Sequence, residues 1–241
     1  MTGRYKIADK TAEITSVYDT VHSLCAAYRT DEKADYAVVT TQADIEYERE
    51  KSAREDALAG VPVRQYPDSY LEELAVYRRI AVQMLQYDTV LFHGSVIAVD
   101  GIGYLFTAKS GTGKSTHSRL WREYFGDRAV MVNDDKPLLH IADTVTAYGT
   151  PYNGKHRLGA NIAVPLRAVC ILTRGAENSI EPVTAEAAYP FLMQQVYRPA
   201  DPLAMQKTLA LTDRLAVRVC LYRLRCNMDI SAARVAYEGM Q

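Results

Sequence analysis

The spacing of apolar and polar residues divides the chain into an N-terminal part and a longer part that follows. In the N-terminal part, short apolar runs alternate with charged ones, which predicts a strand near residues 36–40 and a helix within residues 43–57. Over residues 69–88, apolar side chains recur every three or four positions, as on the buried face of a helix. Ser69 and Glu72 have the spacing of a capping box, so we expect this helix to begin there.

Beyond this helix the pattern changes to short β-branched runs. Residues 90–99 and 103–108 are apolar runs joined by Asp100-Gly101, and this arrangement predicts a β-hairpin. The runs that follow alternate between strand and helix patterns. We expect further strands at 129–132, 137–141, 144–148, 168–173 and 219–224, and helices at 114–125, 184–197, 202–215 and 229–239.

These elements predict an α/β fold. We expect a core of mixed β-sheet flanked by helices, with an N-terminal α+β extension packed on it. A length of 241 residues suits one large domain. We therefore treat residues 1–241 as a single domain, with the N-terminal portion at 1–87 and the core at 88–241.

Composition and charge narrow the classes of partner. Apolar residues make up 48% and charged residues 24% of the chain, a balance typical of a soluble globular protein. The net charge of -1 gives no general attraction to nucleic acid or to an anionic membrane, so we expect neither as a partner. The sequence shows no signal peptide and no apolar run of about 20 residues, which predicts a cytoplasmic protein. Cys25, Cys170 and Cys220 lie in apolar surroundings, as expected of reduced core cysteines.

The sequence FTAKSGTGKST, residues 106–116, has the spacing of a phosphate-binding loop, with alanine at the first glycine position. Glycines allow consecutive backbone N–H groups to point at an anion, and the helix that follows adds the positive end of its dipole. In such a loop Lys114 reaches the β- and γ-phosphates, and the hydroxyl of Ser115 binds Mg²⁺. The predicted cofactors are therefore ATP and Mg²⁺, and the core is a P-loop core. The predicted nucleotide-binding residues are Ser110, Gly111, Thr112, Gly113, Lys114, Ser115 and Thr116.

Two carboxylates follow the short apolar strand that ends at Asn133. Asp134 and Asp135 at a strand end beside a phosphate-binding loop lie where a carboxylate binds the metal of the nucleotide. Two adjacent carboxylates allow a division of labour, in which one binds Mg²⁺ and the other accepts the proton of an attacking hydroxyl. We assign Asp135 to the metal and Asp134 to the proton. A shift of one residue in the strand end would exchange the two roles.

We consider five further residues as weaker candidates. Lys155 and His156 lie in a polar loop and Arg198 lies between two helices, so each is a solvated charge or a contact to phosphate or substrate. His117, at the start of the helix after the loop, is expected on the surface. His93 lies on an apolar strand, where its position alone favours a core histidine.

The residues FHGSVIAVDGIGYLFTAKSGTGKSTHSRLW and VMVNDDKPLLHI resemble the catalytic core of bacterial HPr kinase/phosphorylase. More broadly, they resemble the superfamily that this core shares with phosphoenolpyruvate carboxykinase. The resemblance implies that His93 acts beside the aspartates and the transferred phosphate. It also implies an ATP-dependent kinase whose acceptor is a hydroxyl of a protein, a peptide or a small molecule. HPr kinase has a glutamate where this chain has Thr116, and its arginine-rich signature is missing here, so we expect a forward kinase with little phosphorolysis.

Other functions stay open at this stage. A carboxykinase-like enzyme would use the same loop, although the chain is short for one. A regulatory protein that binds a nucleoside triphosphate without turnover would also carry it. The sequence leaves open the acceptor, the donor (ATP, GTP or pyrophosphate) and whether the protein forms a homo-oligomer.

Overall fold

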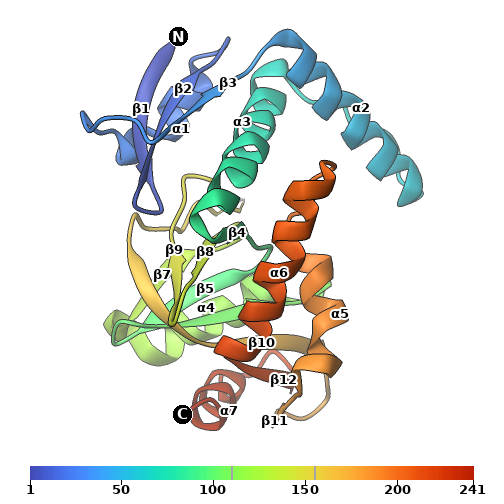
Figure 1. The fold of residues 1–241 in the computed structure, drawn as a ribbon. Coiled ribbons are helices and arrows are strands. Elements are labelled where there is room, and N and C mark those ends of the chain that lie inside the picture. Colours follow the sequence, from blue (N-terminus) through green and yellow to red (C-terminus); the bar gives the residue numbers. More distant parts are fainter. Residues whose placement is uncertain (110, 155) are drawn as a thin grey trace. The chain divides into compact units, whose positions relative to one another are not determined.

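The computed structural model describes residues 1–109, 111–154 and 156–241 (Figure 1). The described chain divides into two compact units, Met1–Gln83 and Met84–Gln241, each with its own β-sheet. Their boundary lies close to the division at residue 87 that the sequence predicts. That the two units form a single domain stays a prediction.

The N-terminal unit is built on a three-stranded sheet in the order β1-β2-β3. β1 and β2 form an antiparallel hairpin whose turn residues, Ala8 and Asp9, have left-handed φ angles of 51° and 59°. The sequence did not predict this hairpin, because alanine is not a typical residue at such a turn. The predicted strand near residues 36–40 is confirmed as β3, which runs parallel to β2. The elements of this unit are β1 (Thr2–Ile7), β2 (Lys10–Thr15), α1 (Thr20–Leu24), η1 (Ala26–Tyr28), β3 (Tyr36–Val39), α2 (Gln42–Leu58) and α3 (Asp68–Met84).

The predicted start of α3 is wrong by two residues, and the predicted capping box is absent because Glu72 has other hydrogen-bond partners. The helix already begins at Asp68, so Ser69 lies inside it and the two residues form no capping box. The Glu72 carboxylate instead accepts hydrogen bonds from the backbone N–H groups of Val17 and Tyr18, both at 2.7 Å. Because Glu72 is fully buried, these donors outside its own helix satisfy a charge that a cap would have left in solvent.

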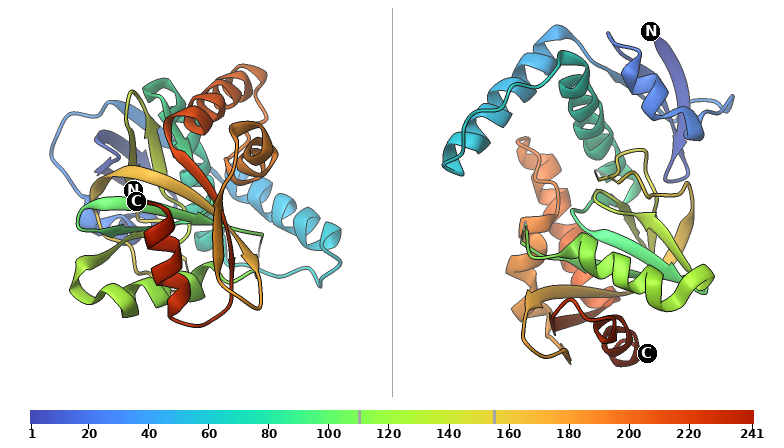
Figure 2. Two further views of the ribbon diagram at one scale, coloured as in Figure 1. Left: turned by 90° about the horizontal axis from the view of Figure 1, so that it is seen from below. Right: turned by 180° about the vertical axis from the view of Figure 1, so that it is seen from behind.

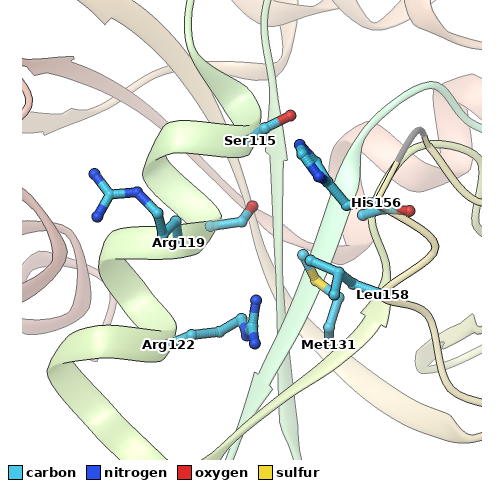
Figure 3. Close-up of a pocket in the computed structure, with 8 residues that line it drawn as sticks. Ser115, Arg119, Arg122, Met131, His156 and Leu158 are labelled. Carbon is cyan, nitrogen blue, oxygen red and sulfur yellow. The ribbon is translucent and has the colours of Figure 1, made fainter.

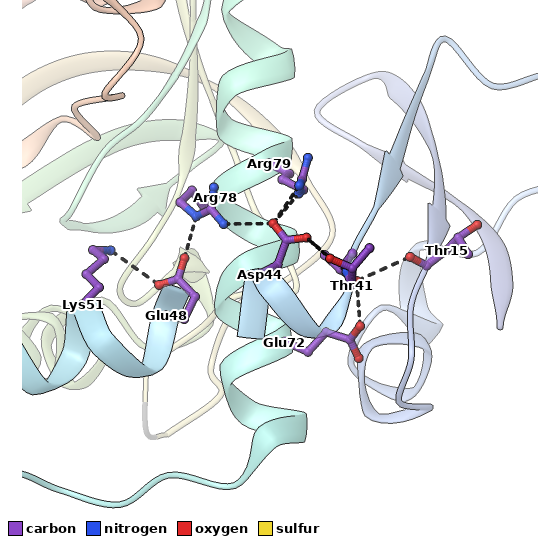
Figure 4. A network of polar contacts seen from close by, with 9 residues as sticks. Thr15, Thr41, Asp44, Glu48, Lys51, Glu72, Arg78 and Arg79 are labelled. Atoms are coloured by element: carbon purple, nitrogen blue, oxygen red, sulfur yellow. Dashed lines mark hydrogen bonds and ion pairs between the residues drawn. The ribbon is translucent and has the colours of Figure 1, made fainter. Parts of the chain in front are cut away.

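A network of buried carboxylates and arginines joins α2 to α3 (Figure 4). One oxygen of Asp44 accepts hydrogen bonds from Arg79 at 2.9 Å and Arg78 at 3.3 Å, and the other accepts the N–H of Thr41 at 3.1 Å. Glu48 accepts a hydrogen bond from Arg78 at 2.5 Å. Burial alone would raise the pKa of Asp44, but the hydrogen bonds from Arg79 and Thr41 hold it below its ordinary value.

The second unit contains a mixed sheet, in agreement with the predicted α/β class. Within the described residues, the strand order is β4-β8-β9-β10-β6-β5-β7, and β12 pairs with β10 and β11. β10 is parallel to both β6 and β12, whereas the other neighbouring strands are antiparallel. The strands are β4 (Thr89–Leu91), β5 (Ser95–Val99), β6 (Ile102–Thr107), β7 (Ala129–Asn133), β8 (Leu138–Ile141), β9 (Val145–Tyr148), β10 (Ala163–Arg174), β11 (Ser179–Pro182) and β12 (Cys220–Cys226).

Helices cover both faces of this sheet (Figure 2). Neighbouring residues of β5 point to opposite faces: Val96 packs in the cluster that contains α5 and α6, and Ile97 packs in the cluster that contains α4 and α7. This alternation is the pattern of a strand that is buried on both sides. The helical elements are η2 (Leu85–Tyr87), α4 (Lys114–Phe125), η3 (Gly126–Arg128), α5 (Ala185–Gln195), α6 (Pro202–Arg218) and α7 (Ser231–Gly239).

Two expectations for this unit are corrected. The run 90–99 is not one strand, because β4 pairs with β8 while β5 pairs with β6 and β7. Between them, the N–H groups of Phe92 and Gly94 donate to the carbonyls of Pro137 and Asp135, so the connecting segment follows the chain after β7. Cys220 is exposed at the start of β12, whereas Cys25 and Cys170 are buried as expected, and all three are free thiols.

Length and apolar character decide whether a helix of the described residues could span a membrane. Among them, every helix is either too short or too polar to cross a bilayer.

Candidate functional site

Several segments reach one edge of the larger sheet because of the directions of their strands. β5 is antiparallel to both β6 and β7, so the start of β5 lies beside the ends of β6 and β7. In register, Val96 of β5 pairs with Leu105 on one side and Asn133 on the other. β10 is parallel to β6 and ends at the same edge. The edge therefore collects His93, the loop after β6, the two aspartates after β7, and Arg174.

The loop between β6 and α4 has the backbone conformation that its glycines predict. Gly111 and Gly113 have φ angles of 77° and 124°, values that L side chains rarely adopt. α4 begins directly afterwards at Lys114, and the N–H of His117 donates to the carbonyl of Gly113 at 2.9 Å. Ser110 lies outside the described residues. The other predicted nucleotide-binding residues, Gly111, Thr112, Gly113, Lys114, Ser115 and Thr116, lie in this loop and in the first turn of α4.

Arg174, the last residue of β10, holds the loop from the side of the neighbouring strand. Its guanidinium donates to the carbonyl of Gly111 at 2.6 Å and to that of Thr112 at 3.5 Å. In a trans peptide the C=O and the following N–H point in opposite directions. The N–H of Gly113 is therefore directed away from Arg174, as an anion-binding loop requires.

Asn133 sets the direction in which the two aspartates leave β7. Its fully buried side-chain oxygen accepts the N–H groups of Asp135 at 2.9 Å and Lys136 at 2.6 Å. Its side-chain nitrogen donates to the hydroxyl of Thr150 at 3.0 Å. Because both the oxygen and the nitrogen of the Asn133 side chain form hydrogen bonds, the turn after β7 is held in one conformation, and Asp134 and Asp135 leave it in defined directions.

Asp135 pairs with His93. The Nε2 atom of His93 lies 3.4 Å from Oδ1 of Asp135. The histidine is held through its backbone, since its N–H donates to the carbonyl of Gln195 at 2.8 Å and its carbonyl accepts the hydroxyl of Thr107 at 3.0 Å. Burial alone would raise the pKa of Asp135, but the hydrogen bond from His93 and the positive charges nearby hold it below its ordinary value. Asp135 is therefore a carboxylate at neutral pH.

Lys114 is the cation that this carboxylate faces at longer range. Burial at the start of α4 lowers the pKa of Lys114, and the negative charge of Asp135 opposes that shift. Within the described residues no ion pair neutralises this ammonium at close range, and a half-buried charge of this kind is costly.

Asp134 points to a different neighbour. Its Oδ1 atom accepts the N–H of Gly154 at 2.6 Å, and its backbone carbonyl accepts the hydroxyl of Ser95 at 2.9 Å. A Cβ atom at position 154 would lie 3.2 Å from Oδ2 of Asp134, so glycine permits this close approach. Adjacent carboxylates thus leave the strand with separate partners.

Two pockets lie on either side of the loop after β6. The first, of about 290 Å³, lies between α4 on one side and β7 and the loop after β9 on the other, and the Ser115 hydroxyl and the His156 ring point toward one another across it (Figure 3). The second, of about 400 Å³, lies toward β10 and β12 and includes Lys109, Thr112 and Arg174. Asp134 lines the first pocket. The loop therefore separates two spaces, each large enough for a small molecule or part of one.

Residues 70–232 match the family described as SynChlorMet cassette protein ScmC. The matched region covers more than half of the chain and includes every element from the first turns of α3 to the start of α7. The chain belongs to the ScmC family. The loop, both aspartates, His93 and both pockets of this ScmC-family chain lie inside the matched region.

No curated protein matches the chain. Among solved structures, the chain is similar to the Hpr(Ser) kinase/phosphatase from Coxiella burnetii, with 12% sequence identity and a TM-score of 0.34 over 62% of this chain and 95% of that chain. A similarity of this degree carries no conclusion about function. Membership of the superfamily of HPr kinase and phosphoenolpyruvate carboxykinase stays a prediction for this ScmC-family chain.

The donor atoms at the sheet edge fit a Mg²⁺ ion that arrives with a nucleotide. Within the described residues, no group of three or more His, Cys, Asp or Glu side chains could hold a metal by itself. Mg²⁺ bound with a nucleotide needs fewer protein ligands, because phosphates and water complete its shell. Ser115 is exposed with its hydroxyl facing the first pocket, and Asp135 is ionised, so these two predicted residues have suitable chemistry.

The remaining predicted residues have different outcomes. Lys155 lies outside the described residues, whereas its neighbour His156 lines the first pocket. Arg198 is exposed and lines neither pocket, so its predicted contact to phosphate or substrate stays a prediction. The expectation that His117 lies on the surface is wrong. His117 is 2% exposed and accepts a hydrogen bond from Trp121 at 3.0 Å, and burial lowers its pKa to about 3.

Arg174 and Arg122 are candidate residues that sequence reasoning missed. Arg174 ends the apolar strand β10. The place of β10 beside β6 could have been inferred only from the parallel order of the strands. Arg122 lies eight positions after Lys114 on α4, on the helix face that lines the first pocket. The helical spacing of Ser115, Ser118 and Arg122 is a signal that could have found it.

Proposed function

We propose that this ScmC-family chain is an ATP-dependent, Mg²⁺-requiring kinase that transfers a phosphoryl group to a hydroxyl. One observation carries the proposal: a half-buried Lys114 at a helix start faces an ionised Asp135, while the adjacent Asp134 lines a separate pocket. Phosphoryl transfer needs positioning and charge neutralisation at one place and a proton acceptor at another. This arrangement supplies both from neighbouring residues.

The phosphates of the donor would lie over the loop after β6. Backbone N–H groups of the loop and the N-terminus of α4 offer hydrogen bonds and partial positive charge to the β- and γ-phosphates. Lys114 would add a full positive charge, and its partial burial strengthens that interaction relative to a fully exposed lysine. Mg²⁺ at Ser115 and Asp135 would neutralise charge that develops on the transferred group.

The second pocket offers a place for the nucleoside of the donor. It opens beside Thr112 and is lined by the aromatic ring of Phe191 and by Arg174 and Arg223. An aromatic ring and guanidinium groups can stack on a base and bind ribose or phosphate oxygens. The donor would thus extend from the loop toward β10 and β12, which leaves the first pocket for the acceptor.

Asp134 would accept the proton of the attacking hydroxyl. The N–H of Gly154 orients its carboxylate through Oδ1, and no partner is shown for Oδ2 within the described residues. A carboxylate that is oriented but not fully satisfied can receive a proton without losing its position. Asp135, in contrast, is engaged with His93 and Lys114 on the phosphate side.

Thermal denaturation with Mg-ATP and a measurement of γ-phosphate loss test this function together. We expect Mg-ATP to raise the melting temperature, because a ligand that binds only the folded state stabilises it. Lys114→Ala should remove most of this shift, whereas Lys109→Ala, which changes a lysine of the second pocket, should retain more of it. We also expect the wild type to release the γ-phosphate slowly to water when no acceptor is present. A melting temperature that Mg-ATP shifts equally in Lys114→Ala would contradict nucleotide binding at this loop. A normal shift without any loss of γ-phosphate, even with acceptors, would instead indicate a regulatory nucleotide-binding protein.

A further inference from the structure

The pocket on the α4 side has a lining that goes beyond what a proton acceptor needs. One wall is the face of α4 that carries Arg122, and the opposite wall includes Met131 and Leu158 (Figure 3). Ser118 of α4 also lines the pocket. Asp134 lines the same space. If Asp134 takes the proton of the acceptor, as the proposed function states, the remainder of the acceptor must lie among these side chains.

Arg122 is exposed and lines this pocket, and within the described residues no ion pair neutralises its positive charge. Its guanidinium extends toward Met131, and within the described residues no ion pair or hydrogen bond is shown for it (Figure 3). Arg119, one turn earlier, also lines the pocket, but its guanidinium points away from Arg122 and pairs with Glu123 at 3.0 Å. Of the two arginines, Arg122 is therefore the one placed to bind an anionic group of a ligand.

Ser118 provides a second, independent indication of a ligand. The residue is 2% exposed, and its hydroxyl is buried without a hydrogen-bond partner in the described structure. Buried hydroxyl groups nearly always have a partner, so an unpaired hydroxyl on a residue that lines a pocket is a candidate contact for a ligand. A carboxylate bound to Arg122 could accept this hydrogen bond as well.

The size and the apolar wall limit the acceptor further. A volume of about 290 Å³ corresponds to roughly ten water molecules at about 30 Å³ each, which is enough for a molecule, or the end of a chain, with about ten non-hydrogen atoms. Met131 and Leu158 offer contacts to a short aliphatic part between the polar groups.

We propose that this pocket binds the phosphoryl acceptor, and that the acceptor carries a carboxylate a few bonds from its reacting hydroxyl. The carboxylate binds Arg122 and Ser118, and the hydroxyl lies at Asp134. In the transfer, the hydroxyl oxygen forms a bond to the γ-phosphorus and its proton passes to the Asp134 carboxylate. The bond from the γ-phosphorus to the bridging oxygen breaks, and its electron pair leaves with ADP. The inference rests on the proposed kinase function.

Acceptor turnover with matched probes tests this inference. The probes are L-serine, L-threonine, D-glycerate and a tetrapeptide that ends in serine with a free carboxyl group, each beside its amide counterpart. ADP formation with Mg-ATP is followed for the wild type, Arg122→Gln and the control Arg119→Gln. We expect at least one free acid to be phosphorylated with kcat/KM about 10- to 100-fold above its amide, the range of a charge-assisted hydrogen bond. Arg122→Gln should reduce kcat/KM for that acid by a similar factor and leave its amide unchanged. Arg119→Gln, which removes a charge of the same pocket that is already paired with Glu123, should reduce kcat/KM for the acid much less. Comparison of kcat/KM for the free amino acids and glycerate with kcat/KM for the peptide shows whether the carboxylate belongs to a small molecule or to the end of a peptide chain.

Two results would overturn the inference. One is equal turnover of an acid and its amide. The other is an acid acceptor whose kcat/KM is unchanged by Arg122→Gln. Phosphorylation of neutral hydroxyl compounds alone would overturn the inference in the same way. If no probe reacts, equilibrium binding of the four acids in the presence of a non-hydrolysable Mg-ATP analogue decides, and absence of Arg122-dependent binding counts against the pocket. The shift in melting temperature by Mg-ATP is measured on the same samples: its presence in Arg122→Gln shows that the nucleotide site is intact, so failure here is distinct from failure of the kinase function.

Discussion

Carboxylates are treated differently in the two units of this chain. In the N-terminal unit, both oxygens of Asp44 accept hydrogen bonds, and Glu48 lies between Arg78 and Lys51. In the second unit, Asp134 and Asp135 each show one oxygen with a partner in the described structure. The side chain of Glu48 is 2% exposed and that of Asp135 is 29% exposed.

The difference separates a structural use of charge from a functional one. A buried carboxylate that arginines fully satisfy contributes to stability only as part of its network, and it has no capacity left for a ligand. A carboxylate that has one oxygen without a hydrogen-bond partner lowers the stability of the fold, but that oxygen can bind a metal or accept a proton. Loss of charge should therefore unfold one region and inactivate the other.

The largest expected effect on stability comes from Glu48→Ala. Removing this carboxylate takes from the partly buried guanidinium of Arg78 its shortest ion pair, at 2.5 Å, and leaves its contact with Asp44 at 3.3 Å. Breaking a buried ion pair in this way typically costs about 3–5 kcal/mol in the free energy of unfolding. Urea unfolding followed by hydrogen exchange of amides in α2 and α3 measures the loss.

Glu50→Ala is the matched control on the same helix, because Glu50 pairs with Arg54 at 3.5 Å with both side chains 61% exposed. It should leave the urea midpoint unchanged, since exposed ion pairs contribute little. If Glu48→Ala and Glu50→Ala were equally stable, the contrast between the two units would fail on its structural side.

A smaller effect is expected from His117, a buried histidine with one satisfied nitrogen. Trp121 donates to Nε2, so Nδ1 carries the proton, and this atom is buried without a partner in the described structure. Burial lowers the pKa of His117 to about 3 from an ordinary value of 6.5. Between these values the unfolded chain binds a proton that the folded chain does not, so stability falls as the pH is lowered below about 6.5.

The fall is about 1.4 kcal/mol per pH unit for one proton, or about 2 kcal/mol between pH 6.5 and pH 5. His117→Gln can still accept the hydrogen bond of Trp121 and has no such proton. The difference in unfolding free energy between wild type and variant should therefore shrink or reverse as the pH falls. Parallel pH profiles for the two proteins would show that the histidine is not held neutral.

The smallest effect on stability is expected from Lys114→Met in the absence of nucleotide. Burial disfavours the charge of this lysine, and its attraction to Asp135 only partly offsets that cost. Because the side chain remains partly exposed, solvent screens much of the penalty. The melting temperature of the free protein should stay the same or rise slightly. A clear drop would show that Lys114 supports the fold rather than a ligand.

Much of the larger unit was predictable because local patterns decide it. The helix at 114–125 begins where two glycines and a lysine follow a strand, and the hairpin turn at Asp100-Gly101 carries a strong turn signal. The break within residues 90–99 was not predictable. Only the pairing of Phe92 and Gly94 with the chain after β7 divides that apolar run.

The residue types of the candidate site were predictable from spacing, whereas the place of His93 beside the aspartates was expected only from the resemblance to HPr kinase. Gly111, Lys114 and the aspartate pair were found from spacing alone, but the pairing of His93 with Asp135 depends on three strands meeting at one edge. Arg174 and Arg122 were missed for the same reason. Isolated arginines in a sequence show neither which strand lies beside them nor which face of a helix lines a pocket.

The most direct test of the account measures Asp134→Asn and Asp135→Asn side by side. For each variant, the Mg²⁺-dependent affinity for ATP is measured by calorimetry, and transfer to the acceptor is measured in a single turnover. We predict that Asp134→Asn binds Mg-ATP like the wild type and transfers ~10²-fold or more slowly, as expected for loss of a general base. Asp135→Asn should bind Mg-ATP more weakly, and both variants should unfold at nearly the same urea concentration as the wild type. If both variants transferred at close to the wild-type rate, the aspartates would be structural and the proposed kinase mechanism would be wrong.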